Sequence, residues 1–416
     1  MLNLLRSRFG CLLVLAFQVL CLASALSAQV PGSFFGMHMS VRALRSGAWP
    51  PIPFSSLRLW DTKTSWAQLN PSRGKYEWGT LDDWLNDTQS HGVDVLYTFG
   101  HTPPWASSGA RQDSCAYEPG ACSPPNDLKD DGSGSDQNWK DFVTAIAKHS
   151  AGKIKYWEIW NEPINRKMWT GTIPQLVRMA KDANSIIKSI DPDAVVLTPT
   201  LAMGTPRAKS WTKEYFATGA GDYADAIAYH AYVSVPEDVV QVIEDLRNTA
   251  GKYGQDSKPL WQTEGSWGKS ESVGFTDFDQ QADYMIKLYT LLTSYRVAKF
   301  YWYAWANPGW GTLWSPDRGA RPAAMAYEKV HGWLLGAVFK QPCRVTDDVW
   351  TCDFTKAGNI SENRIVWAAR QGKVNYTPPA TFRVQRDLAD RSTAVKGAIT
   401  ISSRPVLLTN QANTQR

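Results

Sequence analysis

The chain has 416 residues, which is enough for one large domain and a smaller one. Hydrophobic residues make up 43% and charged residues 20%, the ordinary composition of a globular protein. The formal net charge is only +5, and no run or stripe of basic residues occurs, so we expect no nucleic-acid partner.

Residues 1–28 have the pattern of a cleaved signal peptide. Arg6 and Arg8 give a positively charged start, residues 11–22 are mostly apolar, and residues 23–25 (Ala-Ser-Ala) form a small-residue cleavage site. The apolar run is too short to span a bilayer comfortably. The pattern therefore predicts an exported protein, secreted or periplasmic, without stable membrane insertion.

Export makes the four cysteines after this segment informative, because disulfides form in oxidising compartments. Three pairings are formally possible. The local one joins Cys115 to Cys122 and Cys343 to Cys352, and each bridge then closes a short loop. A zinc site is the alternative, but no histidine lies at ligand spacing from either pair. We therefore expect two local disulfides and no metal.

Between residues 34 and 307, short β-rich runs alternate with longer amphipathic stretches. The predicted strands are Phe34–Met39, Ser56–Asp61, Val93–Gly100, Ile154–Glu162, Ala194–Thr200, Ala226–Tyr232, Pro259–Trp267 and Lys299–Asn307. Helical spacing of apolar residues predicts helices at Asn138–Ser150, Pro174–Ile190, Pro236–Tyr253 and Asp277–Tyr295. Eight strand–helix units predict an α/β fold, a (β/α)8 TIM barrel over residues 29–336. The alternative, a doubly wound open sheet, requires a glycine-rich phosphate turn after the first strand, and none is present.

Two long insertions interrupt this pattern, Thr102–Gln137 after the third strand and Asn307–Arg321 after the eighth. The first insertion carries one cysteine pair and several acidic residues. Calcium binding by these acids is an alternative, but their spacing fits no hand-type loop, so a solvated acidic turn is preferred. The acids concerned are Asp127, Asp130, Asp131 and Asp136.

After a predicted helix at about Pro322–Leu335, the sequence changes to short strands separated by turn signals. These strands are Val345–Phe354, Arg364–Ala369, Thr381–Gln385, Ala398–Ser402 and Val406–Thr409. The change predicts a small all-β, sandwich-like domain over residues 337–416.

Reactive groups in a β/α barrel lie at the C-terminal ends of its strands. The fourth strand ends on Asn161, Glu162 and Pro163, and proline biases Glu162 toward an extended backbone. The seventh strand carries Glu264. The other strand ends offer His38, Arg58, Asp61, His101, His230, Tyr232 and either Trp302 or Trp305. Two carboxylates, an amide, histidines, an arginine and aromatic rings favour cleavage of a glycosidic bond over phosphoryl or acyl transfer.

At these residues the sequence resembles a known clan. The stretch Trp157-Glu158-Ile159-Trp160-Asn161-Glu162-Pro163, with His230-Ala231-Tyr232 and Gln262-Thr263-Glu264 after it, is similar to the retaining glycoside hydrolases of the β/α-barrel clan. Gly36-Met37-His38, Arg58-Leu59-Trp60-Asp61 and the C-terminal β domain make it most similar to family 39, which contains β-xylosidases, iduronidases and exopolysaccharide hydrolases.

The resemblance implies a two-step mechanism without a cofactor. Glu162 protonates the leaving oxygen and later deprotonates water, whereas Glu264 attacks the anomeric carbon. The two carboxylates are then expected about 5–5.5 Å apart. The charge of Glu264 is expected to raise the pKa of Glu162 and keep it protonated near neutrality.

The resemblance also implies roles in binding a carbohydrate substrate. Asn161 holds the 2-hydroxyl of the sugar, Tyr232 orients Glu264, and Arg58 keeps Glu264 ionised. The side chains expected to line the subsite of the cleaved sugar are His38, His101 and His230, with Trp302 as its floor.

Several simpler interpretations stay open. Glu158 lies deeper on the same strand and is expected to be a paired acid inside the barrel, and Arg58 could serve only that pair. His230 could be structural, and Asp61 is expected to cap a strand end. For the whole protein, the alternatives are a family 5-like endo-glucanase or mannanase and an inactive sugar-binding barrel. The sequence gives no indication of the oligomeric state.

Overall fold

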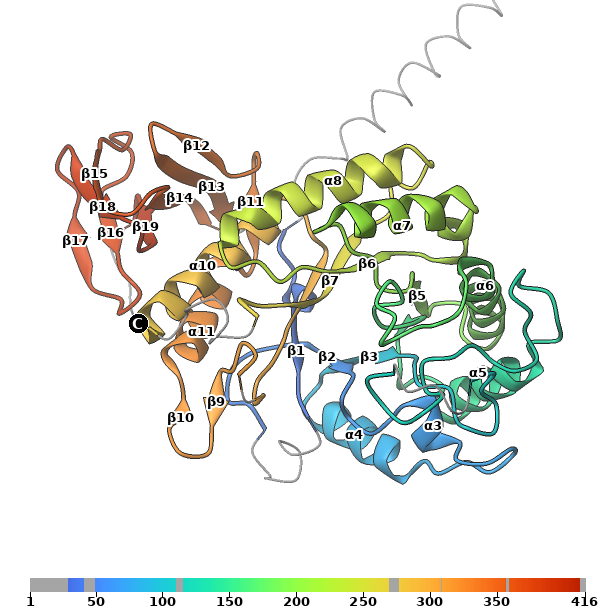
Figure 1. Cartoon of the computed structure of the whole chain (residues 1–416). Coiled ribbons are helices and arrows are strands. Elements are labelled where there is room, and N and C mark those ends of the chain that lie inside the picture. Colours follow the sequence, from blue (N-terminus) through green and yellow to red (C-terminus); the bar gives the residue numbers. More distant parts are fainter. Residues whose placement is uncertain are drawn as a thin grey trace, which may run out of the picture.

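The computed structural model describes residues 29–40, 49–109, 115–268, 277–307, 309–356 and 359–411. The predicted signal segment, residues 1–28, lies outside this described part. Parallel strands surrounded by helices form the larger body of the molecule, and antiparallel strands at the C-terminal end form a smaller body beside α10 and α11 (Figure 1).

The larger body is a parallel barrel whose strands follow the order β5-β4-β3-β2-β1-β8-β7-β6. Its strands are β1 (Phe35–His38), β2 (Ser56–Leu59), β3 (Asp94–Thr98), β4 (Tyr156–Glu158), β5 (Val195–Leu197), β6 (Ile227–His230), β7 (Leu260–Gly265) and β8 (Lys299–Trp302). Single parallel bridges from Leu197 to Ala226 and from Leu201 to Tyr229 join β5 to β6 and close the barrel. The predicted (β/α)8 barrel is therefore confirmed, and the open doubly wound sheet is excluded.

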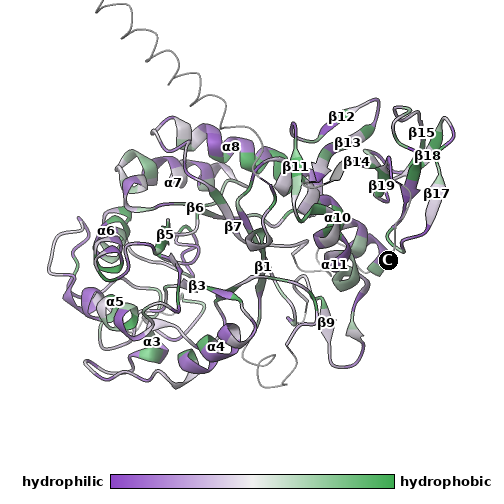
Figure 2. Ribbon diagram, turned by 180° about the vertical axis from the view of Figure 1, so that it is seen from behind, coloured by the Kyte–Doolittle hydropathy of each residue, from purple (hydrophilic) through white to green (hydrophobic). Residues whose placement is uncertain are grey.

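The helices predicted from apolar periodicity are present close to their predicted bounds. They are α5 (Gln137–His149), α6 (Ile173–Ile190), α8 (Val239–Gly251), α10 (Phe278–Ser294) and α11 (Pro322–Leu334). The chain also forms α3 (Trp66–Leu69), α4 (Gly79–Ser90), α7 (Pro206–Ala217) and the 3-10 turns η1 (Gly32–Phe34), η2 (Ala220–Tyr223) and η3 (Pro236–Asp238). Hydrophobic and hydrophilic segments alternate along the helices around the barrel, as one buried face predicts (Figure 2).

Helix α6 illustrates how the sequence builds these helices. Thr172 caps its first turn together with Gln175 in a capping box, and Pro174 occupies a position in that turn where its missing N–H costs nothing. Leu176, Met179 and four further apolar residues are buried at helical spacing against the core. No helix in the described residues is long and apolar enough to cross a membrane.

The chain leaves the sheet earlier at β4 than predicted. The strand ends at Glu158 rather than at Glu162, and Glu162 has a φ of 44°, in the left-handed region. The N–H of Asn165 donates to the carbonyl of Glu162 at 2.9 Å, so a tight turn begins at this residue. The expectation of an extended Glu162 is wrong, because the turn outweighs the local bias from Pro163.

The smaller body contains β11 (Ala337–Phe339), β12 (Arg344–Thr346), β13 (Val349–Lys356), β14 (Asn359–Ala368), β15 (Lys373–Tyr376), β16 (Val384–Arg386), β17 (Ser392–Ala394), β18 (Ile399–Ser402) and β19 (Val406–Thr409). One sheet follows the order β11-β13-β14-β19-β16-β17 with β12 beside β13, and β15 pairs with β18. Val366, Phe382, Ile401 and Leu408 belong to a separate buried cluster within this body. An all-β C-terminal region is confirmed, whereas the exact boundary between residues 336 and 337 stays a prediction.

One predicted strand of this region is wrong. Val345–Phe354 forms a hairpin of β12 and β13, because Asp347 and Asp348 both have positive φ angles, 52° and 59°, and connect paired Thr346 and Val349. Aspartate tolerates this conformation and a two-residue hairpin loop requires it.

The smaller body is attached to the barrel by buried contacts. The indole N–H of Trp367 donates to Glu237 at 2.6 Å, and the N–H of Cys343 donates to the Ser294 hydroxyl at 3.2 Å. Both predicted disulfides, Cys115–Cys122 and Cys343–Cys352, are present. The second holds β13 at this junction.

Candidate active site

Arg58, on β2, is the centre of a buried hydrogen-bond network at the mouth of the barrel. It donates from Nε to Glu158 at 2.7 Å, from Nη1 to Glu264 at 2.6 Å and from Nη2 to Asn161 at 2.7 Å. Burial alone would lower the pKa of Arg58, but the charges of Glu158 and Glu264 raise it above its ordinary value. Arg58 thus contacts both partners that the sequence suggested, the deep barrel acid and the predicted nucleophile.

Both carboxylate oxygens of Glu158 accept hydrogen bonds from groups inside the barrel. Its Oε2 accepts from Arg58 and from the hydroxyl of Thr98 at 2.7 Å, and its Oε1 accepts from the hydroxyls of Thr200 at 3.1 Å and Thr263 at 2.6 Å. The side chain is fully buried. Glu158 is therefore a structural acid whose hydrogen bonds position Arg58.

Glu264, on β7, faces the same network because β7 is irregular at this point. Thr263 and Glu264 are consecutive, yet both side chains reach groups inside the barrel, and the pairing of β7 with β8 shifts register between Gln262 and Gly265. An irregularity of this kind breaks the alternation of side chains along a strand. A Cβ on Gly265 would lie 2.9 Å from the carbonyl oxygen of Ala231, so glycine is required beside Glu264.

Two short hydrogen bonds fix the Glu264 carboxylate. Arg58 holds Oε1, and the hydroxyl of Tyr232, just after β6, donates to Oε2 at 2.7 Å. Asn161 uses its carbonyl oxygen to accept from Arg58, which turns its amide N–H groups away from the arginine. The contact predicted between Tyr232 and Glu264 is thus present.

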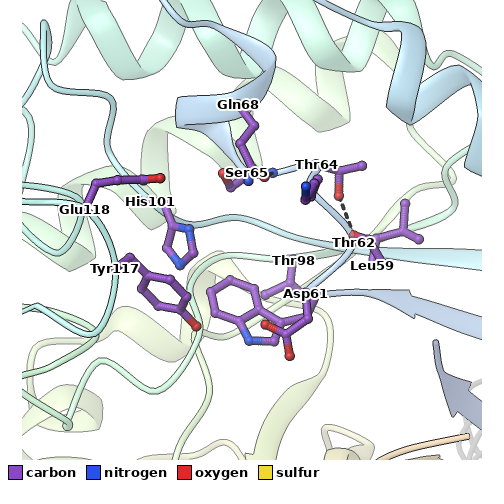
Figure 3. A pocket seen from close by; sticks show the side chains of 12 residues that line it. Leu59, Asp61, Thr62, Thr64, Ser65, Gln68, Thr98, His101, Tyr117 and Glu118 are labelled. Carbon is purple, nitrogen blue, oxygen red and sulfur yellow. Dashed lines mark hydrogen bonds between the residues drawn. The ribbon is translucent and has the colours of Figure 1, made fainter. Parts of the chain in front are cut away.

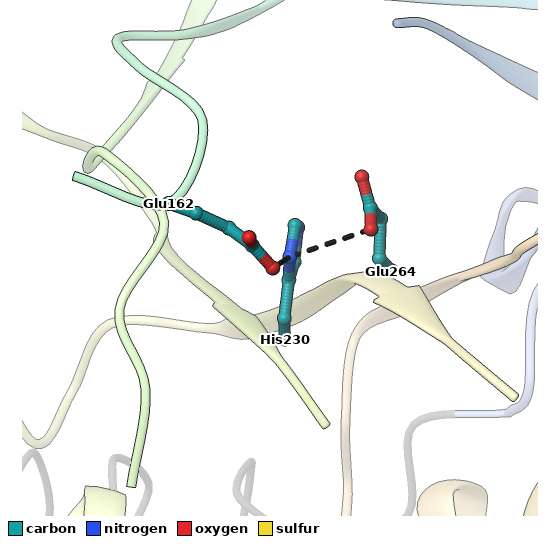
Figure 4. A group of neighbouring side chains, drawn as sticks. All are labelled: Glu162, His230 and Glu264. Carbon is teal, nitrogen blue, oxygen red and sulfur yellow. Dashed lines mark hydrogen bonds and ion pairs between the residues drawn. The ribbon is translucent and has the colours of Figure 1, made fainter. Parts of the chain in front are cut away.

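His230 lies between the two candidate glutamates (Figure 4). Its Nδ1 is 2.9 Å from Oε1 of Glu162 and 3.5 Å from Oε2 of Glu264. One carboxylate oxygen of Glu162 and one of Glu264 lie within 4.8 Å of each other. His230 was expected to line a sugar subsite or to be structural, and its contact with both carboxylates was not predicted.

This contact changes the expected titration of the pair. Burial raises the pKa of Glu162, but the hydrogen bond and charge of His230, followed by the charge of Arg58, hold it below its usual value. Burial is the main reason that the pKa of Glu264 lies above its usual value, against the opposing charges of His230 and Arg58. The expectation that Glu162 has the raised pKa is wrong for the free enzyme, because it did not include His230.

Removing His230 should therefore move the pH profile in a defined direction. His230 lowers the pKa of both Glu162 and Glu264, so His230→Gln should raise both. We expect both limbs of the bell-shaped dependence of kcat/KM on pH to move to higher pH. His149→Gln, at a surface histidine, is the control. Limbs that stay in place, or that move to lower pH, would contradict this account.

The aromatic residue at the mouth of β8 is Tyr303 and not Trp302. Trp302 is fully buried, and its indole N–H donates to the carbonyl of Gly311 at 2.8 Å. The prediction that Trp302 floors the subsite is wrong: Tyr301 packs inside the barrel, so alternation turns Trp302 toward the helices. Trp305 is also buried. Tyr303 is partly exposed, and its hydroxyl donates to Asp61 at 2.7 Å.

The other two predicted histidines differ in position. His38 is almost completely buried, with Nε2 2.9 Å from the carbonyl oxygen of Thr263 and its ring against Tyr303 at 4.9 Å. Burial, and then the charge of Arg58, lowers its pKa well below the ordinary value. His38 therefore lies beneath the subsite. His101 is partly exposed, and burial lowers its pKa to about 4, so its imidazole is neutral at pH 7.

His101 lines a pocket of its own (Figure 3). The pocket has a volume of about 160 Å³ and lies at the ends of β2 and β3, where Trp60, Asp61 and Tyr117 also line it. Neither Tyr117 nor Tyr303 was predicted from the sequence to be a site residue. Tyr117 lies in a long loop whose path cannot be read from periodicity, and Tyr303 is one residue beyond the predicted platform.

Among the described residues, one cluster of side chains has the geometry to hold a metal ion. Glu162, His230 and Glu264 are the one group of acids and histidines there whose atoms converge enough to hold an ion. Arg58 and Tyr232 already occupy both oxygens of Glu264, and the guanidinium at 2.6 Å opposes a second cation. In the described part of the long loop, the acids considered as calcium ligands do not converge in this way. Asp127 instead accepts from the N–H groups of Gln137 and Asn138 at the start of α5.

The chain is similar to known glycosyl hydrolases. Residues 132–313 match the family model described as the glycosyl hydrolase catalytic core. No curated protein matches the chain. Among solved structures, a family 39 glycoside hydrolase from Bacteroides cellulosilyticus WH2 is similar with a TM-score of 0.67 and 16% identity, covering 91% of this chain and 80% of that one.

Two further solved structures each cover 92% of this chain and 97% of their own. A monomeric β-xylosidase from Caulobacter crescentus CB15 has a TM-score of 0.61 and 16% identity. A family 30 endoxylanase from Clostridium papyrosolvens C71 has a TM-score of 0.61 and 12% identity. At these identities the likeness establishes the fold, and the family model establishes the class of enzyme. The chain is a glycoside hydrolase, with a glycosyl hydrolase catalytic core in the barrel fold shared by family 39 and family 30 enzymes.

Proposed function

We propose that the protein is a secreted, retaining glycoside hydrolase of the family 39 type, which cleaves β-glycosidic bonds in an oligosaccharide or polysaccharide. The observation that carries the proposal is the separation of the two carboxylates, whose nearest oxygens lie within 4.8 Å. Retaining enzymes have carboxyl groups about 5–5.5 Å apart, whereas inverting enzymes need about 6.5–9.5 Å to admit a water molecule.

In the first step Glu264 attacks the anomeric carbon, and Glu162 gives its proton to the leaving oxygen. Arg58 and Tyr232 hold Glu264 in one orientation and stabilise its carboxylate, which suits a nucleophile. The carbonyl of Asn161 is bound to Arg58, so its amide can donate to the 2-hydroxyl of the sugar. Tyr303 is the aromatic side chain placed to contact the ring.

In the second step Glu162 removes a proton from water, which attacks the glycosyl-enzyme. Formation of the ester removes the charge of Glu264, whereas His230 and Arg58 remain to lower the pKa of Glu162. The same arrangement therefore favours the base form of Glu162 when a base is needed. In the free enzyme, the productive state needs a protonated Glu162 and an ionised Glu264. Because the pKa of Glu162 lies below its usual value, Glu162 is protonated only at acidic pH. We therefore place the activity optimum below pH 7.

Export is part of the proposal. The signal-like segment at residues 1–28 and the two disulfides support an oxidising destination, either periplasmic or extracellular. Within the clan, a family 5-like endo-glucanase or mannanase stays the alternative, because its catalytic groups would hardly differ. An inactive sugar-binding barrel is disfavoured by the complete set of catalytic contacts.

The test is a hydrolysis screen with product sizing. The purified protein is incubated with xylan, glucan, mannan and bacterial exopolysaccharides, and with aryl β-glycosides, beside the Glu264→Ala variant as a blank. We expect the wild type to release sugars from at least one β-linked substrate and the variant to release none. Binding without turnover on every substrate would contradict the proposal and favour the inactive barrel.

A further inference from the structure

The pocket at the ends of β2 and β3 lies outside the two-step mechanism, but it is connected to the catalytic centre. Asp61, on its wall, accepts the hydroxyl of Tyr303, and Tyr303 packs against His38 at 4.9 Å and Tyr232 at 6.5 Å. Burial chiefly raises the pKa of Tyr117, another wall residue, and the charges of Asp61, Glu264 and Glu162 raise it further, in that order. Asp61 and Tyr303 therefore link the pocket to Tyr232, the side chain that donates to Glu264.

Flat rings form one wall of this pocket (Figure 3). The rings of His101 and Tyr117 lie 3.6 Å apart between centroids, and Trp60 packs edge-on at 5.0 Å from His101 and 6.1 Å from Tyr117. Trp60 fits only because Gly100 is beside it: a Cβ there would lie 2.8 Å from the indole ring. Buried aromatic groups with few rotatable bonds make a rigid surface for the C–H face of a sugar.

Polar groups also line the pocket. The hydroxyls of Thr62 and Thr64 share a hydrogen bond of 2.7 Å, and Asp61 keeps a carboxylate at the opening. Nε2 of His101 is buried and has no hydrogen-bond partner in the described structure. Asp61 and His101 both have left-handed backbones, with φ angles of 62° and 61°, and such strain gathers where a fixed geometry is used.

We infer that this pocket is a second sugar subsite on the glycone side, which takes a neutral, hydroxyl-rich unit next to the sugar at the scissile bond. The inference rests on the proposed function, since Glu264 must be the group at the anomeric carbon for its side to be the glycone side. A pocket that combines aromatic rings with hydroxyl and carboxylate acceptors suits uncharged sugar hydroxyls. The enzyme then recognises at least two units of its donor chain.

The test compares 4-nitrophenyl β-glycosides that carry one or two units of xylose, glucose or mannose. For the sugar that wild type accepts, kcat/KM should be at least about tenfold higher with two units, because binding energy from the remote unit stabilises the transition state. Tyr117→Ala should lower kcat/KM for the two-unit substrate toward the one-unit value and change the one-unit value less than about twofold. Tyr253→Ala, at an exposed tyrosine just after the end of α8, is the control.

Each result decides a different point. Equal kcat/KM for one and two units in wild type, or an equal loss on both in Tyr117→Ala, would overturn the subsite and leave the proposed function intact. A wild-type enzyme that hydrolyses no substrate of either length would contradict the proposed function, and the subsite with it. A thermal unfolding midpoint for Tyr117→Ala equal to that of wild type excludes misfolding as the cause of a loss.

Discussion

Glu264→Ala is expected to abolish hydrolysis of every substrate, by more than about 10⁴-fold, because no glycosyl-enzyme can form without the nucleophile. Glu162→Ala should behave differently. With a natural sugar leaving group it should lose about 10²–10⁴-fold, the usual contribution of general acid catalysis. With an activated aryl leaving group it should form the intermediate and then stall, since no base remains to activate water.

Azide separates the two roles, because it attacks without needing a base. It should restart turnover in Glu162→Ala and give a glycosyl azide that keeps the configuration of the substrate, and it should not restart turnover in Glu264→Ala. The measurement is the rate on an activated aryl glycoside with and without azide, with Glu214→Ala on the surface of α7 as control. A dead Glu162→Ala and a rescued Glu264→Ala would reverse the two roles.

Arg58→Met should have the second large effect, on stability as well as activity. It leaves Glu158 without its main partner in a fully buried site and removes one of the two donors to Glu264. Breaking a buried ion pair from one side costs about 3–5 kcal/mol, because an uncompensated charge stays behind. We expect a lower midpoint in urea unfolding at an unchanged m-value, and a large loss of kcat in the fraction that folds.

A matched control lies in an exposed ion pair of the C-terminal region. Arg370 pairs with Asp348 at 3.1 Å, both residues are exposed, and exposed pairs contribute about 0.2–1 kcal/mol. Arg370→Met should therefore lower the free energy of unfolding far less than Arg58→Met. Equal losses from the two substitutions would show that the network around Arg58 does not hold the mouth of the barrel together.

The sequence predicted the fold because its signals are local and repeated. Alternating strands and amphipathic helices identify the barrel, and helices such as α6 have clear caps and apolar spacing. Errors arose where one residue decides the outcome. Trp302 ends β8 and Tyr303 follows it directly, and the sequence alone does not say which of the two faces the site. In the C-terminal region, two aspartates with positive φ angles turned one predicted strand into a hairpin.

The sequence predicted most of the residues that form the candidate site, but not the directions in which the pKa values of its two glutamates shift. Glu162, Glu264, Asn161, Arg58 and Tyr232 stand in motifs at strand ends, so their convergence follows from barrel topology. The contacts of His230 with both carboxylates depend on the left-handed turn at Glu162, which has no sequence signal. The order of the two glutamate pKa values was therefore predicted wrongly.

The most direct test of the central claim is proton NMR of the first product released from a β-linked substrate. The short separation of the Glu162 and Glu264 carboxylates leaves no room for an interposed water, so two successive displacements are expected. The signal of the β-anomer should appear first, and the α-anomer should follow only as mutarotation proceeds. Initial release of the α-anomer would mean a single displacement by water and would contradict the assignment of Glu264 as nucleophile.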